Sequence, residues 1–119
     1  MDTGTRERLI ATYFDAIDDG TYDRFTDVFT EDTRYLHPNH EPVTGVESLV
    51  QSVDDIRRTY DSTHTVDRTI HGEEVTVCEG TVAGEMPGEG DFEGGFVDVF
   101  EFDDDAEKIS YTKVYVYNR

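Results

Sequence analysis

The sequence of 119 residues predicts a single α+β domain, in which helices come first and antiparallel strands follow. Apolar side chains recur at helical spacing in the first half of the chain and alternate with polar side chains in the second half. The strand-like segments are consecutive, and helices segregated from consecutive strands are typical of α+β folds. The length fits one domain, residues 1–119, and is sufficient for a buried core.

The first predicted helix covers residues 5–19. Its apolar positions follow the i, i+4, i+8 spacing of one helical face. Thr3 or Thr5 is the predicted N-cap, and Gly20 stands just beyond the predicted end. The predicted buried face consists of Leu9, Ile10, Tyr13, Phe14 and Ile17.

Two further helices are predicted before the pattern changes. A short helix covers residues 22–29, and a brief strand follows over residues 33–37. The third helix covers residues 44–60, where Thr44 and Glu47 have the spacing of a capping box.

Four strands are predicted in the second half. Residues 63–71 and 74–82 are rich in β-branched side chains, and residues 95–102 and 108–117 show the clearest alternation. The glycine-rich acidic stretch 84–95 predicts a loop between the second and third of these strands.

The charge of the chain is strongly negative. There are 28 acidic and 10 basic side chains, and the formal net charge is −18. A field of this sign argues against partners such as nucleic acids and anionic membranes. The acids are dispersed and lysine is rare, which favours adaptation to a salt-rich cytoplasm, as in a halophile. An acidic face for a basic partner is the alternative.

Other features narrow the class of protein. One cysteine excludes a disulfide framework. No apolar run reaches the ~18 residues of a membrane span, and the N-terminus lacks a signal-peptide pattern, so a cytoplasmic location is expected. There is no phosphate-binding glycine motif, GxSxG or HExxH.

Asp98 is the most informative acid. In the predicted strand 95–102, alternation places it on one face with the phenylalanines Phe96, Phe100 and Phe102. A carboxylate among phenylalanines loses hydration, so its pKa rises, as in a general acid or hydrogen-bond donor. The alternative is that strand twist or an arginine partner keeps Asp98 solvated or paired.

The histidines and the cysteine are secondary candidates. His37 ends the first strand and has the side chain best suited to move protons at neutral pH, although an exposed loop histidine is the alternative. His40 lies in the same loop, but two histidines alone are a weak metal signal, and no metal is predicted. His64 faces inward or is a satisfied strand residue. His71 is expected at the surface, and Cys78 is expected to be a buried thiol.

The first predicted helix and the last predicted strand both contain tyrosines. Tyr13, in the helix, is expected to be a core residue with its hydroxyl at the edge of the core. In the last strand, Tyr111, Lys113, Tyr115 and Tyr117 share a face, which either lines a pocket or forms an outer, subunit-facing surface. Periodicity alone does not decide between these two faces.

Three segments resemble one superfamily. These are YFDAIDDGTYDRFTDVFTEDTRYLHP (13–38), TGVE (44–47) and FVDVFEF with KISYTKVYVY near the end. They resemble the nuclear transport factor 2-like superfamily, which includes the SnoaL-like polyketide cyclases and the ketosteroid isomerases. The resemblance implies a curved antiparallel sheet around the first helix, a conical apolar pocket and a homodimer.

The resemblance also implies roles for residues. The helix tyrosine, the pre-proline base and the late-strand aspartate of ketosteroid isomerases fall on Tyr13, His37 and Asp98. His37 would then remove a proton α to a carbonyl, and protonated Asp98 and Tyr13 would donate hydrogen bonds to the enolate oxygen. Further ligand-binding residues are expected at His64, Phe96, Phe100, Tyr111 and Lys113.

The expected function is cofactor-free acid–base chemistry on a small apolar carbonyl compound, by enolisation, isomerisation or cyclisation. Whether the chain is an enzyme stays open at this point. One alternative is a non-catalytic pocket protein that binds a ligand or oligomerises. Another is a hydrolase or dehydratase that activates water through His37 or Asp98. An aromatic row of Tyr111, Tyr115 and Tyr117 would suit a homodimer interface.

Overall fold

A computed structural model describes residues 1–118. The helical elements are one long helix, a 3₁₀ turn continued by a short helix, and a third helix, and they are joined with six strands. In chain order the elements are α1 (Thr3–Asp19), η1 (Tyr22–Arg24), α2 (Phe25–Val28), β1 (Phe29–Leu36), β2 (Val43–Thr44), α3 (Val46–Arg57), β3 (Asp61–His71), β4 (Val75–Met86), β5 (Gly90–Asp103) and β6 (Lys108–Asn118).

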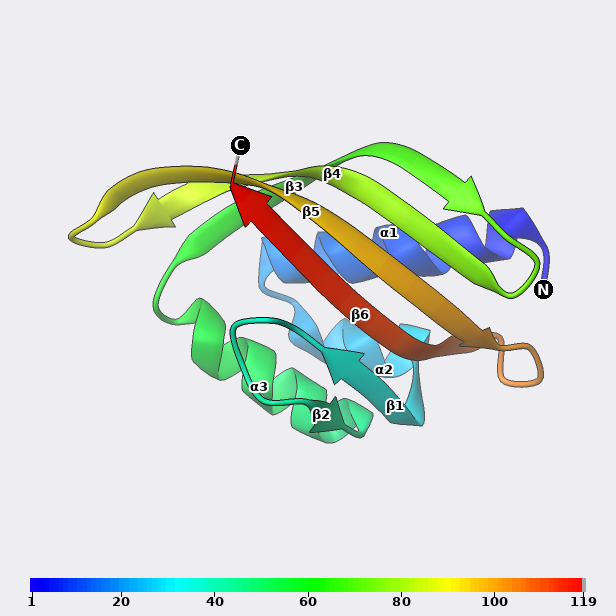
Figure 1. The fold of residues 1–119 in the computed structure, drawn as a ribbon. Helices are drawn as coiled ribbons and strands as arrows, with labels where there is room; N and C mark the ends of the chain where they lie inside the picture. The colour runs from blue at the N-terminus through cyan, green and yellow to red at the C-terminus, as the bar shows by residue number, and fades with distance from the viewer. Residues whose placement is uncertain (119) are drawn as a thin grey trace.

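The strands form one sheet in the order β2-β1-β6-β5-β4-β3 (Figure 1). The predicted antiparallel meander is the part from β3 to β6. β1 adds to β6 in the parallel direction, and β2 pairs antiparallel with β1, so the sheet is mixed. The predicted α+β fold is therefore confirmed, with one parallel pair that the sequence pattern did not indicate.

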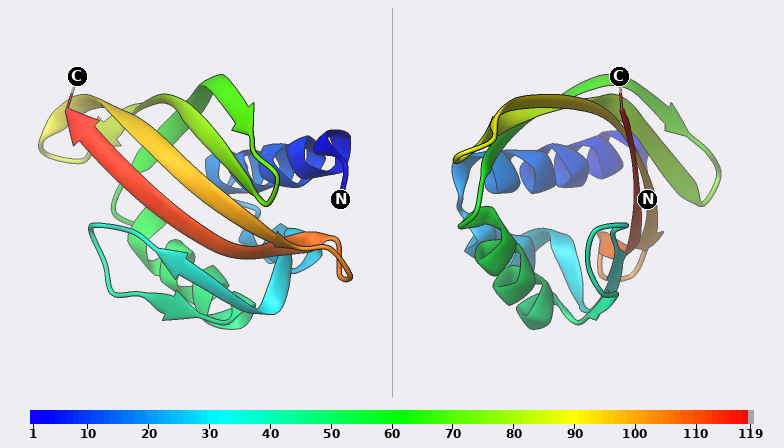
Figure 2. Two further views of the ribbon diagram at one scale, coloured as in Figure 1. Left: turned by 45° about the vertical axis from the view of Figure 1, so that its right-hand side comes forward. Right: turned by 60° about the vertical axis from the view of Figure 1, so that its left-hand side comes forward.

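The sheet curves around α1, and α3 lies on the side that the strands leave open (Figure 2). Two glycines allow close approach at the edge of the sheet. A Cβ at Gly80 would lie 2.0 Å from the Thr65 carbonyl oxygen, and one at Gly84 would lie 1.9 Å from the Asp61 carbonyl oxygen. Only glycine tolerates such a contact, so these positions let β3 bend closely over β4.

Helix α1 buries the predicted face. Leu9, Ile10, Tyr13, Phe14 and Ile17 are all buried. Gly20 adopts φ 76° after the last turn, and its N–H donates to the carbonyls of that turn. The N-cap is Asp2 rather than Thr3 or Thr5: its backbone is extended, and Oδ1 accepts a 2.7 Å hydrogen bond from the Thr5 N–H.

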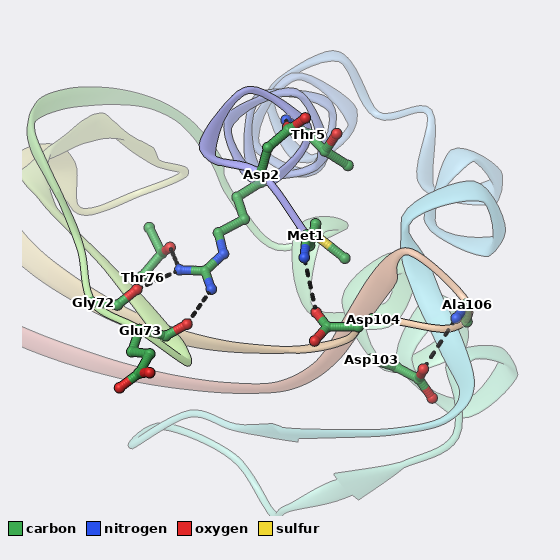
Figure 3. A network of polar contacts seen from close by, with 10 residues as sticks. Met1, Asp2, Thr5, Gly72, Glu73, Thr76, Asp103, Asp104 and Ala106 are labelled. Carbon is green, nitrogen blue, oxygen red and sulfur yellow. Dashed lines mark hydrogen bonds and ion pairs between the residues drawn. The ribbon is translucent and has the colours of Figure 1, made fainter.

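Buried Arg6 fastens α1 to the turn between β3 and β4. Its guanidinium donates to the Gly72 carbonyl at 2.7 Å, the Glu73 carbonyl at 2.6 Å and Thr76 Oγ1 at 3.3 Å. Figure 3 shows these three acceptors together, beside the ion pair of the N-terminal amine with Asp104. These hydrogen bonds attach helix α1, inside the curved sheet, to a turn that lies more than 60 residues later in the chain.

The N-cap of helix α3 lies one residue after the predicted N-cap Thr44. This N-cap is Gly45, with φ 96° and no side-chain cap, and the last residue of the helix is Arg57 rather than Tyr60. Thr44 instead belongs to β2 and pairs with Arg34. The capping-box prediction is wrong because strand pairing, a tertiary contact, takes the backbone of Thr44 out of the helix.

The predicted loop 84–95 is mostly strand. β4 continues to Met86, β5 begins at Gly90, and these two residues face each other across a short turn. Gly88 and Gly90 have positive φ, as a tight reversal requires. Glycines and acids are poor strand formers, so local propensity missed pairing that the long hairpin supplies.

The core contains a cluster of aromatic side chains around Tyr13. The Tyr13 ring packs edge-on against Phe29 and Phe100, at centroid distances of 5.5 and 5.7 Å. Cys78 is fully buried, as predicted, and burial raises the pKa of its thiol to about 11. This packing fixes one side of the cavity described next.

Candidate active site

A cavity of about 560 Å³ lies between the sheet, α1 and α3. Its volume suits a small organic molecule. The apolar lining is Ile17, Val53, Ile56, Val82, Met86, Phe92, Phe96, Val114 and Val116. The polar lining is Tyr13, Tyr35, His37, Asn39, His40, Arg57, Tyr60, Ser62, His64, Glu93, Asp98, Tyr117 and Asn118.

Asp98 lines the cavity from β5 and is 2% exposed. Phe96 and Phe100 are buried with it, as alternation predicted. Among the described residues, Oδ1 of Asp98 has no hydrogen-bond partner. Burial raises the pKa of this carboxyl to about 8, because the ionised form loses its hydration without compensation. Asp98 is therefore a neutral carboxylic acid at pH 7, with a proton to donate.

Tyr13 forms a pair with Tyr35. Their hydroxyl oxygens lie 2.6 Å apart, and both side chains are buried. Burial raises the pKa of each phenol, and a negative charge on Asp98 opposes their ionisation further. Two hydroxyl groups joined by one hydrogen bond use one proton between them. The second proton remains available to a molecule in the cavity.

His37 lies at the cavity just after β1, in the loop where it was predicted. Partial burial, together with smaller contributions from the neighbouring His40 and His64, lowers its pKa to about 4. The ring is therefore neutral at pH 7. Its Nδ1 accepts a 3.1 Å hydrogen bond from the Asn39 N–H, so the proton of the neutral ring is on Nε2.

This tautomer bears on the role predicted for His37. A general base needs a free lone pair, but Nδ1 is occupied and Nε2 carries the proton. In the described structure His37 is thus placed to donate a hydrogen bond from Nε2. Its ring stacks on His40, with centroids 4.8 Å apart. No group of three or more metal-ligating side chains occurs within residues 1–118.

His64 also lines the cavity, from β3. Its ring packs against Phe14 and Phe96, with centroids 5.5 and 5.4 Å away. Asp18, near the end of α1, accepts a hydrogen bond from the His64 backbone N–H at 3.0 Å and contacts the ring Nδ1 at 2.7 Å. A histidine and a carboxylate are therefore paired at the wall of the cavity.

Arg57 places a cation at the cavity from the last turn of α3. It donates hydrogen bonds to Ser62 Oγ and to the Ser62 carbonyl oxygen, the latter at 3.1 Å, and its guanidinium carbon lies 5.2 Å from the Tyr60 ring centroid. These contacts join α3 to the start of β3.

Three predicted ligand-binding residues do not line the cavity. Phe100 is fully buried in the core beside Tyr13. Tyr111 and Lys113 are on the opposite face of β6 from Val114 and Val116, which line the cavity. His64 and Phe96 do line it.

The burial pattern of β6 shows which face of the last strand lines the cavity. Simple alternation fails near the start of β6. Glu101 pairs with Tyr111 and Phe102 pairs with Ile109, so Ser110 is an extra residue in β6 and Ile109 is buried. Such a bulge reverses the faces of the residues before it. Tyr115 and Tyr117 are about half exposed, and the homodimer interface stays a prediction.

Sequence reasoning missed Tyr35 and Arg57 at the cavity, and it missed Asp18, the partner of His64. Tyr35 was detectable, because it alternates with His37 across one intervening residue of the first strand and so shares its face. Asp18 and Arg57 gave no local signal, since Asp18 contacts His64 and Arg57 contacts the Ile17 carbonyl oxygen, and both partners are distant in sequence.

A scan against family models matches residues 10–111 to the SnoaL-like domain. The chain belongs to the SnoaL-like domain family. The match covers most of the sequence, and it agrees with the resemblance of residues 13–38 and of the final strands.

Solved structures share the fold of this SnoaL-like domain. An NTF2-like protein from Anabaena variabilis matches with a TM-score of 0.84 and 17% identity, covering 98% of this chain and 89% of that chain. A protein with a ketosteroid isomerase-like fold from Catenulispora acidiphila has a TM-score of 0.83 and 14% identity, covering 92% and 85%. An LEH-like epoxide hydrolase from M. tuberculosis has a TM-score of 0.78 and 16% identity, covering 92% and 76%.

At these identities the likeness shows the fold alone. A search of curated proteins found no match. No helix within residues 1–118 of the SnoaL-like domain is long and apolar enough to cross a membrane.

Proposed function

We propose that this SnoaL-like domain catalyses cofactor-free acid–base chemistry on a small, largely apolar carbonyl compound. The observation that supports this most is Asp98, a buried carboxyl with an unpartnered Oδ1 at a cavity of about 560 Å³. Leaving such a group unsatisfied costs stability, and an incoming oxygen atom that accepts its proton removes that cost.

The donors of the cavity suit a developing enolate. Asp98 presents a carboxylic acid proton, and the Tyr13–Tyr35 pair has one hydroxyl proton left over. Both donate toward oxygen, where negative charge accumulates when a proton leaves the carbon next to a carbonyl. Preorganised donors in a water-poor site stabilise that charge strongly. The chemistry includes enolisation and the isomerisation or cyclisation that follows from it.

His37 contributes a third polar group. Its neutral ring and protonated Nε2 make it a hydrogen-bond donor in the resting protein. A neutral imidazole polarises a substrate oxygen without placing a full charge in the apolar cavity.

The largely apolar lining also favours a second candidate, a carrier that binds its ligand unchanged. Both candidates predict binding of an enol mimic, but only the enzyme predicts proton exchange. A hydrolase that activates water at Asp98 is a third reading, and it requires an ionised rather than a protonated Asp98.

The test is proton exchange at carbon. 2-Tetralone, an apolar ketone with acidic α-protons, is incubated with the protein in D₂O, and loss of the α-proton signals is followed by NMR. We expect exchange faster than in buffer, with a rate that falls as Asp98 ionises above about pH 8. Asp98→Leu, which removes the donor, should lower the protein-catalysed rate by about 100-fold.

Asp91→Asn is the matched control, because Asp91 is exposed on the same strand. Binding of 2-naphthol, an aromatic mimic of the enol, is measured in parallel by fluorescence. Binding without exchange would favour the carrier, and an unchanged rate in Asp98→Leu would reject the role of Asp98.

A further inference from the structure

We propose that His64, positioned by Asp18, is the general base that removes the substrate proton in the reaction proposed above. The inference rests on that proposed function and names a residue that the function left unassigned. The evidence for it is the pair of contacts between Asp18 of α1 and His64 of the edge strand β3.

The Asp18 carboxylate contacts His64 at two atoms, the backbone nitrogen and the ring Nδ1. Oδ2 accepts from the backbone N–H at 3.0 Å, and Oδ1 lies 2.7 Å from the ring Nδ1. β3 is the last strand of the sheet, so a backbone N–H that points outward has no strand partner there. Asp18 supplies that partner and, with the same carboxylate, holds the imidazole.

The double contact defines the tautomer of the neutral ring. A carboxylate oxygen only accepts hydrogen bonds, so Nδ1 must carry the proton that lies between them. The lone pair of the neutral ring is then on Nε2, which has no partner within residues 1–118. This is the reverse of His37, whose Nδ1 is the acceptor.

The ring is held in a defined orientation at the cavity wall. It lies between Phe14 and Phe96 and is itself about one-sixth exposed, 17%. Phe96 is two residues from Asp98 on β5, on the same face. The base and the acid are therefore parts of one cavity, separated along its wall rather than in contact.

The proton transfer is balanced. His64 Nε2 takes the proton from the carbon next to the carbonyl, and the C–H electron pair becomes the new C=C bond. The carbonyl π pair moves to oxygen, which accepts a hydrogen bond or a proton from Asp98. The imidazolium that forms is stabilised by the Asp18 carboxylate, and it returns the proton to carbon.

The first arm of the test reads the tautomers in the unmodified protein. Long-range ¹H–¹⁵N correlation spectra distinguish protonated from unprotonated ring nitrogens. We expect a protonated Nδ1 and a free Nε2 in His64, and the opposite in His37. A protonated Nε2 in neutral His64 would overturn the proposal, and this result needs no substrate.

The second arm measures α-proton exchange of 2-tetralone. His64→Gln should lower the protein-catalysed rate by about 100-fold or more. Asp18→Asn should lower kcat more than it changes KM, and it should shift the His64 ring toward the other tautomer. That spectroscopic change separates positioning from a loss of folding.

Controls and outcomes separate this proposal from the proposed function. Asp19→Asn changes an exposed neighbour of Asp18, and His71→Gln changes a histidine outside the cavity; both should keep the wild-type rate. Wild-type exchange no faster than buffer counts against the proposed function. Wild-type exchange that persists in His64→Gln overturns the role of His64 alone.

Discussion

Asp98 couples the proposed chemistry to the stability of the fold at the scale of a single residue. Its pKa rises to about 8 in the folded protein, against about 3.9 in an unfolded chain. The folded state therefore binds this proton more tightly than the unfolded state does. The resulting stabilisation is complete below pH 4 and is lost progressively as the pH rises toward 8.

Replacing Asp98 by Asn should remove this dependence. Between pH 5 and 7, the free energy of unfolding of the wild type should fall relative to that of Asp98→Asn by about 1.4 kcal/mol per pH unit. Urea denaturation at each pH measures the difference. Asp91→Asn should follow the wild type, and parallel curves for wild type and Asp98→Asn would show that Asp98 is not protonated in the fold.

At the scale of elements, α1 is attached to the sheet by more than apolar packing. Arg6 donates hydrogen bonds to the Gly72 and Glu73 carbonyls and to Thr76, and its guanidinium lies 5.1 Å from the Phe102 ring centroid. The same helix carries Tyr13, which lines the cavity, and Asp18, which contacts the cavity residue His64. The attachment thus places two of the proposed functional groups.

Arg6→Ala should lower the free energy of unfolding by about 3 kcal/mol, because it leaves partly buried carbonyl groups without donors. Arg8→Ala removes the same charge from an exposed position of α1 and should change stability by about 0.5 kcal/mol or less. Chemical denaturation of both variants gives the comparison. Equal losses would mean that charge, not the buried hydrogen bonds, is the cause.

Sequence periodicity predicted some of the elements and missed others. The stripe of α1 was predicted because burial of one helical face leaves a period in the sequence. The hairpin through Gly88 and the strand β2 were not, because their backbone is held by pairing with distant residues and not by local propensity. The bulge at Ser110 was also missed, because it arises from the pairing of β6 with β5, and it reverses the faces of the β6 residues before it.

At the scale of the whole molecule, the net charge of −18 opposes the compact state. The proposal of a salt-adapted surface predicts that the melting temperature rises between 10 mM and 1 M KCl. We expect a rise on the order of 5 °C or more, because screening weakens repulsion among exposed acids. Calorimetry measures it directly.

A variant with fewer acids tests the cause of that rise. Asp15, Asp19 and Asp105 are exposed, and replacing all three with Asn should reduce the salt dependence. A melting temperature that does not respond to KCl would reject the salt-adapted surface.

Three features could be inferred from the sequence alone: the α+β class, the buried stripe of α1 and the burial of Asp98 among phenylalanines. All three follow from periodicity, which reports local exposure to water. Three others became visible in the folded chain: Tyr35 hydrogen-bonds to Tyr13, Asp18 contacts His64, and Lys113 faces away from the cavity. These are contacts between distant segments, and their direction depends on the strand register, sheet curvature and loop hydrogen bonds that folding creates.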